Sequence, residues 1–485
     1  MPDSMPWIGD APPAPSQSAA SAVILEIARS KGLQELRQCL RSSCANASKL
    51  HAPLHAIERW LLMSKWEEAL AETNGRPVAD ALFAASGSTP IADAGLASDL
   101  ERAGLSQHQV AGIVLRVQEK SVALAERMAK LARRLASAGE PAPSPVVCEE
   151  VLEEQGGAMV QLHVVSPPAK QGGGASQEDQ GEVVSEQDSG MTVLVTSSCF
   201  EKLRTLYFRQ HATLYLQQDG QRSDWDTTAR EDSFRARAFC CLLRYHSLGG
   251  AGFQAGLGAN VFRELQGSLG CNFELFASPL NCFYGPHCSA FADVDAPFGS
   301  RGSCATFAPR TGSYEVNPPF VPAIMDAMAD RLLALLVEAQ AARHCLSFVV
   351  VLPGWTDNAG YRALSEAAPF LRASLLLAAV DHGFVDGAAH RRQRSHRQSP
   401  YDTRLFVLQT DAAAAQWPAD SEVLTRLERT LAACTPSEDD LKVVPTSERV
   451  HRSGAARSQG RRKMKRAGKK TKAWQASKHR PKGAR

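Results

Sequence analysis

Four consecutive residues, Asn317-Pro318-Pro319-Phe320, have the groups needed to hold the amino group of a planar ring. The lone pair of such an amine is delocalised into the ring, so a catalyst must let the nitrogen become pyramidal and orient it. The amide oxygen of Asn317 and the backbone carbonyl of Pro318 can accept its two hydrogens. The prolines stiffen the turn, and Phe320 offers a stacking face. We therefore expect this loop to position an exocyclic amine for methyl transfer. No strong general base is needed, because nitrogen loses its proton easily once it is methylated.

The place of this loop in the chain supports the interpretation. A short strand expected at Tyr314–Val316 leads into the loop, and a helix expected at Pro322–Ala341 follows it. An ordinary turn is the alternative, since Asn-Pro pairs also mark turns. Asn-Pro-Pro-aromatic resembles the catalytic loop of amino-methyltransferases that act on adenine, cytosine or glutamine. The four residues alone leave the substrate open among these three.

A second motif, Phe276–Asn281 (FASPLN), ends an apolar strand expected at Phe273–Ala277. Its small and turn-forming residues would let the backbone approach the amino-acid end of S-adenosyl-L-methionine (SAM), the methyl donor. A strand that simply ends in a turn is the alternative. The glycine-rich stretch Gly249–Gly258 is no dinucleotide fingerprint, because a helix rather than a strand precedes it.

Strands and helices alternate after Met191 and would position both motifs. Strands are expected at 192–196, 273–277, 314–316, 346–352 and 405–409, and helices at 200–210, 233–245, 260–269, 322–341 and 361–379. This alternation of strands and helices predicts an α/β fold. We expect a Rossmann-like SAM-dependent methyltransferase domain whose mostly parallel sheet is covered by helices on both faces. Ligands of such sheets bind beyond the carboxyl ends of the strands. The catalytic loop and the turn Pro353-Gly354-Trp355 both fall on that rim.

The preceding sequence has apolar residues at three-to-four spacing, which predicts an all-helical domain of five or six short helices. Pro, Gly, Ser and acidic residues then predict a flexible linker or insertion, with one strand at Met159–Val165. The expected segments are a disordered N-terminus at 1–17, the helical domain at 18–138, the linker at 139–190, the methyltransferase domain at 191–420, a C-terminal helix and connector at 421–450, and a basic disordered tail at 451–485.

The net charge of +3 hides an asymmetry. Residues 451–485 contain 14 Lys and Arg and no Asp or Glu, which leaves 40 basic and 51 acidic residues in the rest. Such a tail is typical of a nuclear-import signal, an RNA-binding arm, or both. We therefore expect a nuclear location, with the cytoplasm as a second one. A solvated end without a specific role is the alternative.

Other features exclude classes of protein. No apolar run reaches the ~18–20 residues of a membrane span, and no secretory signal is evident. The 12 cysteines show no C-x-x-C pair, which favours reduced thiols. Cys282, His287, Cys288 and Cys304 fit no common zinc spacing, so we expect no metal.

Two runs of the sequence closely resemble the cap-specific adenosine N6-methyltransferases, which are also called the phosphorylated-CTD-interacting factor family. The runs are FELFASPLNCFYGPHCSAFADVDAPFGSRGSC and then FAPRTGSYEVNPPFVPAIMDAMADRL. VFRELQGSLG precedes these runs, and SFVVVLPGW, FVDGAAH and LFVLQTD follow them. The resemblance covers roughly Ser233 to Asp411 with the order preserved. It implies methyl transfer from SAM to N6 of the first transcribed adenosine, already 2′-O-methylated, next to the m7G cap of mRNA.

The resemblance also implies roles for particular residues. The Asn317–Phe320 loop would be catalytic and would hold the base. Cofactor or pocket roles would fall to Phe276, Ala277, Ser278, Pro279, Asn281, Asp293, Asp295, Phe298, Gly299 and Ser300.

Substrate contacts are expected further along the chain. Trp355, Asp381 and His382 match the family pattern, with core packing or a surface pair as the alternatives. A basic loop at 390–397, with Arg391, Arg392 and Arg394, could bind the cap triphosphate or the RNA backbone. A solvated loop is the alternative reading of this segment.

The sequence also departs from the family. Animal members carry an N-terminal WW domain that binds the phosphorylated tail of RNA polymerase II, whereas Trp7 lacks a partner tryptophan or proline at WW spacing. We therefore expect no WW module, which puts polymerase as a partner in doubt. Val321-Pro322-Ala323 stands where the family tends to have acidic residues, so a substrate contact can be missing. Two alternative functions remain: a general RNA or DNA adenine N6-methyltransferase, and a non-catalytic RNA-binding scaffold.

Overall fold

The computed structural model describes residues 18–48, 51–53, 55–73, 80–84, 90–138, 146–154, 157–165, 191–217, 227–249, 255–387, 389–391 and 396–434. The predicted N-terminus 1–17, the basic tail 451–485, and parts of the linker and of the C-terminal connector lie outside these residues. The described residues up to Cys434 belong to one compact unit.

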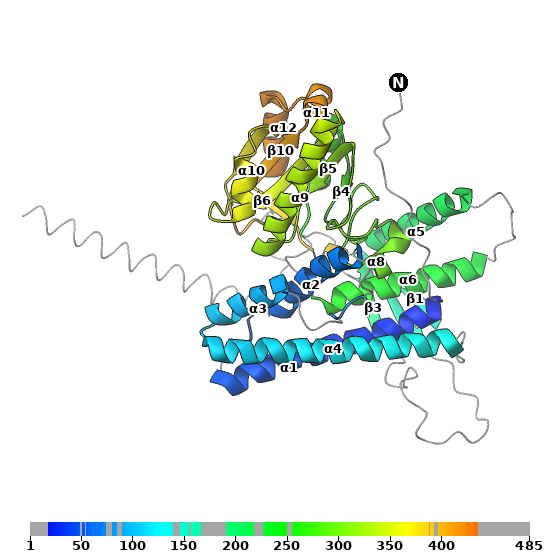
Figure 1. Cartoon of the computed structure of the whole chain (residues 1–485). Helices are drawn as coiled ribbons and strands as arrows, with labels where there is room; N and C mark the ends of the chain where they lie inside the picture. The colour runs from blue at the N-terminus through cyan, green and yellow to red at the C-terminus, as the bar shows by residue number, and fades with distance from the viewer. Residues whose placement is uncertain are drawn as a thin grey trace, which may run out of the picture. The chain divides into compact units, whose positions relative to one another are not determined.

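The N-terminal region is helical, as predicted, and the structure describes four helices there (Figure 1). These are α1 (Ala19–Ser48), α2 (Ala56–Thr73), α3 (Pro90–Arg102) and α4 (Gln107–Ala138). The expectation of five or six short helices was wrong, because α1 and α4 are 30 and 32 residues long. Each of these helices has one buried apolar stripe over its whole length. Several short helices in succession would give the same pattern of apolar residues in the sequence.

The linker prediction was wrong for residues 146–154, which form a strand, whereas the strand expected at Met159–Val165 is present. β1 (Val146–Glu154) and β2 (Gly157–Val165) pair with β3 (Thr192–Thr196) in a three-stranded antiparallel sheet of order β1-β2-β3. Val160, Leu162 and Val164 are buried beneath it. β3 was predicted as a strand of the main sheet but belongs to this small one. The glutamates of β1 obscure its alternation in the sequence.

The main sheet has five strands in the order β4-β5-β6-β10-β7. Its members are β4 (Cys271–Glu274), β5 (Gly312–Val316), β6 (Leu346–Pro353), β7 (Leu371–Leu377) and β10 (Thr403–Gln409). β4, β5 and β6 are parallel, whereas β10 is antiparallel to both of its neighbours. The sheet is therefore mixed, and the prediction of a mostly parallel sheet holds only for the first three strands. β8 (Gly383–Val385) and β9 (His396–Gln398) form a separate hairpin.

The predicted helix at 361–379 was wrong beyond its first turns. α10 (Ala359–Ser365) ends early, and the chain continues as β7. Pro369 has no N–H to continue a helix and disfavours helical geometry in the residue before it. Residues 371–377 then find hydrogen-bond partners in β10.

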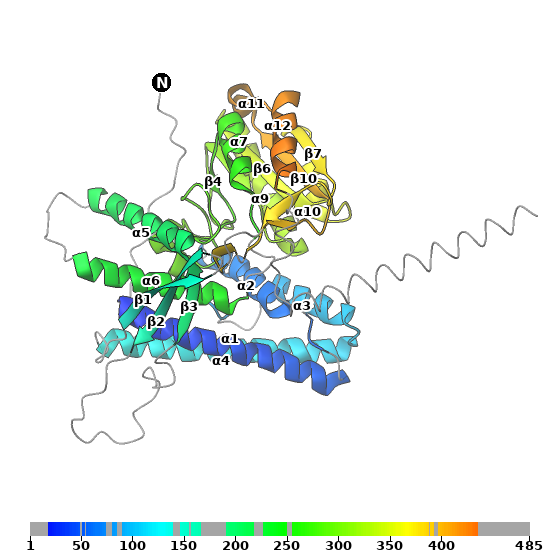
Figure 2. The same cartoon turned by 180° about the vertical axis from the view of Figure 1, so that it is seen from behind.

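Helices cover both faces of the sheet (Figures 1 and 2). α9 (Pro322–Ala341) and α10 lie on one face, with α7 (Ala259–Leu269) and α12 (Ser421–Ala432) on the other. β6 shows the alternation, since Phe348 and Val350 belong to the first apolar core, and Val349 and Val351 to the second. The remaining elements are α5 (Ser197–Gln217), α6 (Thr227–Ser247), α8 (Ala292–Asp295), η1 (Ala296–Phe298), η2 (Ala389–Arg391) and α11 (Asp411–Gln416).

A buried ion cluster joins the N-terminal helices to the α/β region. Arg244 of α6 is fully buried. It donates to Glu26 of α1 at 2.6 and 2.7 Å and to Asp293 of α8 at 2.8 and 3.1 Å. Arg29 of α1 also pairs with Asp293, at 3.1 Å. The two predicted domains are therefore one packed body in the described residues.

Candidate active site

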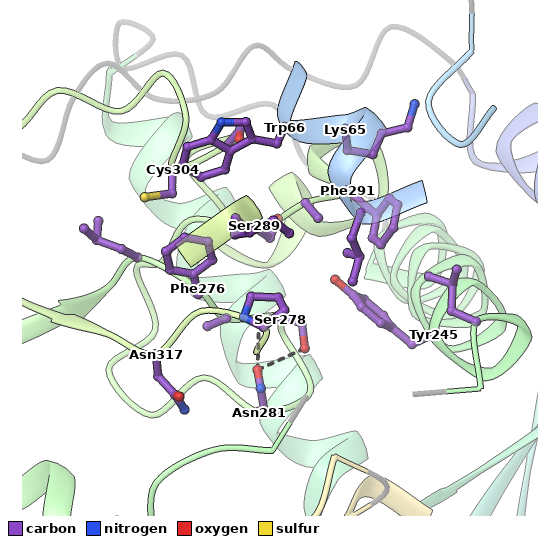
Figure 3. A pocket seen from close by; sticks show the side chains of 18 of the residues that line it. Lys65, Trp66, Tyr245, Phe276, Ser278, Asn281, Ser289, Phe291, Cys304 and Asn317 are labelled. Carbon is purple, nitrogen blue, oxygen red and sulfur yellow. Dashed lines mark hydrogen bonds between the residues drawn. The ribbon is translucent and has the colours of Figure 1, made fainter. Parts of the chain in front are cut away.

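A pocket lies beyond the carboxyl ends of β4 and β5 and is closed on one side by α2 (Figure 3). It has mostly apolar walls with a few polar groups, which is the composition of small-molecule sites. The structure brings six of the predicted residues into its lining: Phe276, Ala277, Ser278, Asn281, Asn317 and Pro319. The two motifs singled out in the sequence therefore face one cavity.

The turn after β4 is held by its own side chains. Asn281 Oδ1 accepts hydrogen bonds from the backbone N–H of Ser278 at 2.7 Å and from its hydroxyl at 3.1 Å (Figure 3). Ala277 N–H donates to the carbonyl of Cys288 at 2.9 Å, which ties the turn to the next segment. The small side chains of Ala277 and Ser278 leave backbone exposed to the cavity.

Asn317 lies at the pocket with its amide oriented by the protein. Nδ2 donates to the carbonyl of Ala255 at 3.2 Å. The opposite atom, Oδ1, accepts no hydrogen bond from the described residues. Because the nitrogen is committed to the backbone, the oxygen is left to accept from a ligand. Pro318 is buried next to it.

Helix α2 supplies a wall that the sequence reasoning missed. Trp66 stacks parallel to Phe276, with ring centroids 6.2 Å apart and an interplanar angle of 3°. Glu58 and Lys65 of the same helix also line the cavity. Nothing in the local sequence signals this, since the spacing of Trp66 on α2 is that of an ordinary core residue.

The predicted cofactor residues Asp293 and Asp295 do not line the pocket. Asp293 accepts from Arg244 and Arg29; burial opposes ionisation, but these guanidinium groups outweigh it and hold the pKa of Asp293 below its ordinary value. Asp295 is fully buried and accepts from the hydroxyl of Tyr245, a pocket residue, at 2.6 Å. Burial raises the pKa of Asp295 to about 6. Asp295 therefore supports a lining residue from outside the pocket, whereas Asp293 pairs with two arginines that do not line it.

Four other predicted cofactor residues also lie outside the lining. Pro279, Phe298, Gly299 and Ser300 are buried. Gly299 has φ of +108°, and a Cβ there would lie 3.2 Å from the carbonyl of Gly285, so the backbone requires glycine. Ser300 Oγ lies 2.7 Å from Oγ of Ser289, which does line the pocket. Their contacts indicate that this segment shapes the cavity indirectly.

Two buried carboxyl groups lie beneath the motifs. Glu274 of β4 and Glu315 of β5 are register partners. Glu274 Oε1 accepts from the N–H groups of Phe283 at 2.7 Å and Tyr284 at 3.0 Å. Burial, and then the nearby Glu274, raise the pKa of Glu315 well above its ordinary value. Glu315 lies two residues before Asn317.

Aromatic rings continue from the catalytic loop. Phe320 meets Trp355 and Phe384 edge to face, each with ring centroids 6.3 Å apart. Trp355 is half-buried at the end of β6, and neither Phe320 nor Trp355 is among the residues that line the cavity itself.

The remaining predicted substrate residues are more dispersed. His382 is fully buried: Nδ1 donates to the carbonyl of Ala378 at 2.7 Å, and Nε2 lies 2.8 Å from the hydroxyl of Thr403. Burial lowers its pKa. Both ring nitrogens are used within the protein, which favours a packing role. Asp381 and Arg391 are exposed, whereas Arg392 and Arg394 lie outside the described residues.

Two kinds of feature are absent from the described residues. None of the helices there combines the length and apolar character needed to cross a membrane. No group of three His, Cys, Asp or Glu is arranged there to hold a metal ion.

Part of the chain is similar in sequence to two mammalian proteins. The mRNA (2'-O-methyladenosine-N(6)-)-methyltransferase of Homo sapiens is 35% identical over 278 residues, which are 55% of this chain and 36% of the human protein. The protein of the same name from Mus musculus is 34% identical over the same shares. The match thus spans little more than a third of the length of these relatives.

A family model described as "Phosphorylated CTD interacting factor 1 WW domain" matches residues 202–387. This match contradicts the expectation, drawn from the surroundings of Trp7, that the chain has no WW module of this family. It covers the segment from α5 to the end of β8. Together the comparisons confirm the resemblance seen in the sequence: over 55% of its length, the chain is similar to the mRNA (2'-O-methyladenosine-N(6)-)-methyltransferases.

Proposed function

We propose that this protein transfers a methyl group from SAM to N6 of the first transcribed adenosine, 2′-O-methylated and adjacent to the m7G cap of mRNA. The observation that carries the proposal is the orientation of Asn317, whose nitrogen is bound to Ala255 while its oxygen is left to accept an amine hydrogen. The names of the relatives, which denote this reaction, supply the substrate class.

The chemistry of the pocket lining supports SAM as the cofactor. Phe276 and Trp66 offer parallel aromatic faces for a flat purine. The turn closed by Ser278 and Asn281 offers exposed backbone for the amino-acid end. When bound, SAM supplies an electrophilic methyl group. We propose a Rossmann-like fold for this region, with β4, β5 and β6 as its parallel part.

The chain's own residues would act on the adenine. Asn317 Oδ1 and the carbonyl of Pro318 accept the two N6 hydrogens and draw the lone pair out of the ring plane. Pro318 and Pro319 hold these acceptors in place before the substrate arrives. Phe320 contacts the face of the base, supported by the edge of Trp355.

The test is methyl transfer from labelled SAM to m7G-capped RNA that begins with adenosine. Asn317→Ala should lower kcat by on the order of 100-fold or more, because it removes a preorganised polar contact to the reacting group. SAM binding, measured by calorimetry, should persist. Asn260→Ala, at an exposed position on α7, is the matched control and should leave both unchanged.

Other outcomes would overturn parts of the proposal. Equal activity on uncapped RNA or DNA would show a general adenine methyltransferase. The absence of detectable SAM binding would favour a non-catalytic RNA-binding protein.

Cellular location and partners belong to the same proposal. The basic tail and the family name favour the nucleus and capped mRNA. With the expected lack of a WW module contradicted, the RNA polymerase II machinery is again a reasonable partner to test.

A further inference from the structure

The segment that orients Asn317 is itself held by a strand from far along the chain. Ala255, whose carbonyl accepts from Asn317 Nδ2 at 3.2 Å, directly precedes Gly256. Gly256 pairs antiparallel with Val385 of β8. Gly256 N–H donates to the carbonyl of Val385 at 3.0 Å, and Val385 N–H donates back to the carbonyl of Gly256 at 2.8 Å. The carbonyl that binds Asn317 is therefore one residue away from a reciprocal pair of backbone hydrogen bonds.

The same strand supports the other end of the catalytic loop. Phe384, which precedes Val385, is buried and meets Phe320 edge to face, with centroids 6.3 Å apart. Phe384 also meets the ring of His382 edge to face, at 5.6 Å. Both ring nitrogens of His382 are bound within the protein. β8 therefore contacts the two ends of the catalytic loop, one through Phe384 and the other through the bridge.

The segment that carries Ala255 is also anchored beyond the bridge. Leu257 is buried in the apolar core that α7 and α12 cover. Gly258 accepts from Val261 N–H at 2.9 Å, and a Cβ at Gly258 would lie 2.4 Å from Sγ of Cys434, so this backbone is closely packed. Ala255 lies on the other side of the bridge from these contacts. The bridge therefore carries their fixed position over to its carbonyl.

The orientation of an amide side chain decides what it can do. The two ends of the Asn317 amide are similar in shape, but the oxygen accepts hydrogen bonds and the nitrogen donates them. A reversed amide would present a donor to an amine that is also a donor. The Ala255 carbonyl selects the productive orientation, because only the nitrogen can bind to it. Neither Gly256 nor Val385 lines the cavity, so their effect on a ligand there is indirect.

We propose that Gly256 and Val385 are positioning residues for methyl transfer. Their bridge selects the orientation of the Asn317 amide through the carbonyl of Ala255, and the same strand supports Phe320. The inference rests on the proposed function, because it gives the bridge a role in presenting the adenine amine. It also separates this role from cofactor binding, which the bridge should not affect.

The test variant is Gly256→Pro. Proline removes the N–H that donates to Val385 and restricts the residue before it. An added Cβ at Gly256 meets no atom within 4 Å, so the change acts on the backbone. With m7G-capped RNA, kcat should fall by about 10- to 100-fold, because small displacements of a reacting group have effects of this size. The affinity for SAM, measured by calorimetry, should remain that of the wild type. Gly256→Ala retains the N–H and should restore kcat.

Ala259→Pro is the matched proline control. Ala259 is the exposed first residue of α7, a position at which proline is tolerated. Gly258 before it already has the extended geometry that a following proline favours, with φ of −72° and ψ of 151°. This variant should keep the kcat of the wild type.

A double-mutant cycle distinguishes positioning from a general loss of structure. If Gly256 acts through Asn317, adding Gly256→Pro to Asn317→Ala should cause little further loss of kcat. A further loss as large as that in the wild type would overturn the inference. An unchanged kcat in Gly256→Pro, or a loss of its SAM binding, would do the same. A wild type without activity on capped RNA would instead contradict the proposed function.

Phe384→Leu tests the second contact without altering the bridge. Leucine keeps an apolar side chain in the core but removes the ring that meets Phe320. The variant should lower kcat/KM for capped RNA by less than Gly256→Pro does, with SAM binding retained. An unchanged kcat/KM would show that β8 does not support Phe320.

Discussion

The two sides of the pocket are stabilised in opposite ways. On the side of α1, α6 and α8, buried charges are paired with each other, as with Arg244 and Glu26. On the side of β6 and β10, half-buried and exposed rings are held by backbone hydrogen bonds, as with Trp355 and Tyr401. A change on the first side leaves a buried group unpaired, whereas a change on the second side leaves the core intact. We expect stability defects from the first and substrate defects from the second.

The strongest test of this contrast is Arg244→Met. It leaves the buried Glu26 with only the longer contact to Arg29 at 3.4 Å, and breaking a buried pair from one side costs about 3–5 kcal/mol. Urea unfolding should show a loss of this size. Arg397→Met removes a half-buried arginine whose contact with Asp386 is longer, at 3.5 Å; it is the control and should cost less. Equal losses in the two variants would remove the distinction between the sides.

The second test concerns the pH dependence of stability. Burial raises the pKa of Asp295 to about 6 from an ordinary 3.8, so the folded state holds the proton more tightly than the unfolded state. The resulting contribution to stability is complete below pH 3.8 and is lost as pH rises through about 6. The free energy of unfolding of the wild type, relative to Asp295→Asn, should therefore fall by about 2 kcal/mol between pH 4 and pH 7. Parallel pH curves for the two proteins would show that Asp295 titrates normally.

The smallest expected effect lies on the exposed side. Arg391→Ala removes a surface cation near the proposed RNA path and should raise KM for capped RNA by about twofold, with less effect as salt is increased. Arg310→Ala, an exposed arginine in another loop, is the control. An unfolding midpoint lowered by Arg391→Ala would place this residue with the structural side instead.

The sequence predicted those parts of the molecule that depend on local order. Helix α9 was expected at Pro322–Ala341 and has these bounds, because a proline suits the first helical position. The loop before it was placed at a strand end, where it lies. β7 was missed because Leu371–Leu377 contains no β-branched residue, and only its pairing with β10 makes it a strand.

Some residues of the site were not predicted from the sequence. Contacts between residues that are far apart along the chain bring them there. Trp66 reaches Phe276 across 210 positions of the chain, and no local pattern distinguishes it from a core tryptophan. Asp293 and Asp295 stood in a motif that matched the family, but their partners, Arg244 and Tyr245, determine that they face away from the cavity. A motif identifies a segment, whereas the packing around it decides which of its side chains reach the ligand.

The ion pair between Glu26 and Arg244 also has a consequence during synthesis. The two residues are 218 positions apart. At translation rates of about 5–20 residues per second, Glu26 would leave the ribosome roughly 10–40 s before its partner. During that interval the apolar stripe of α1 has no α6 to cover it, and the nascent helices are exposed to aggregation or chaperone binding. The packed body that this ion pair joins can therefore form only after most of the chain has been synthesised.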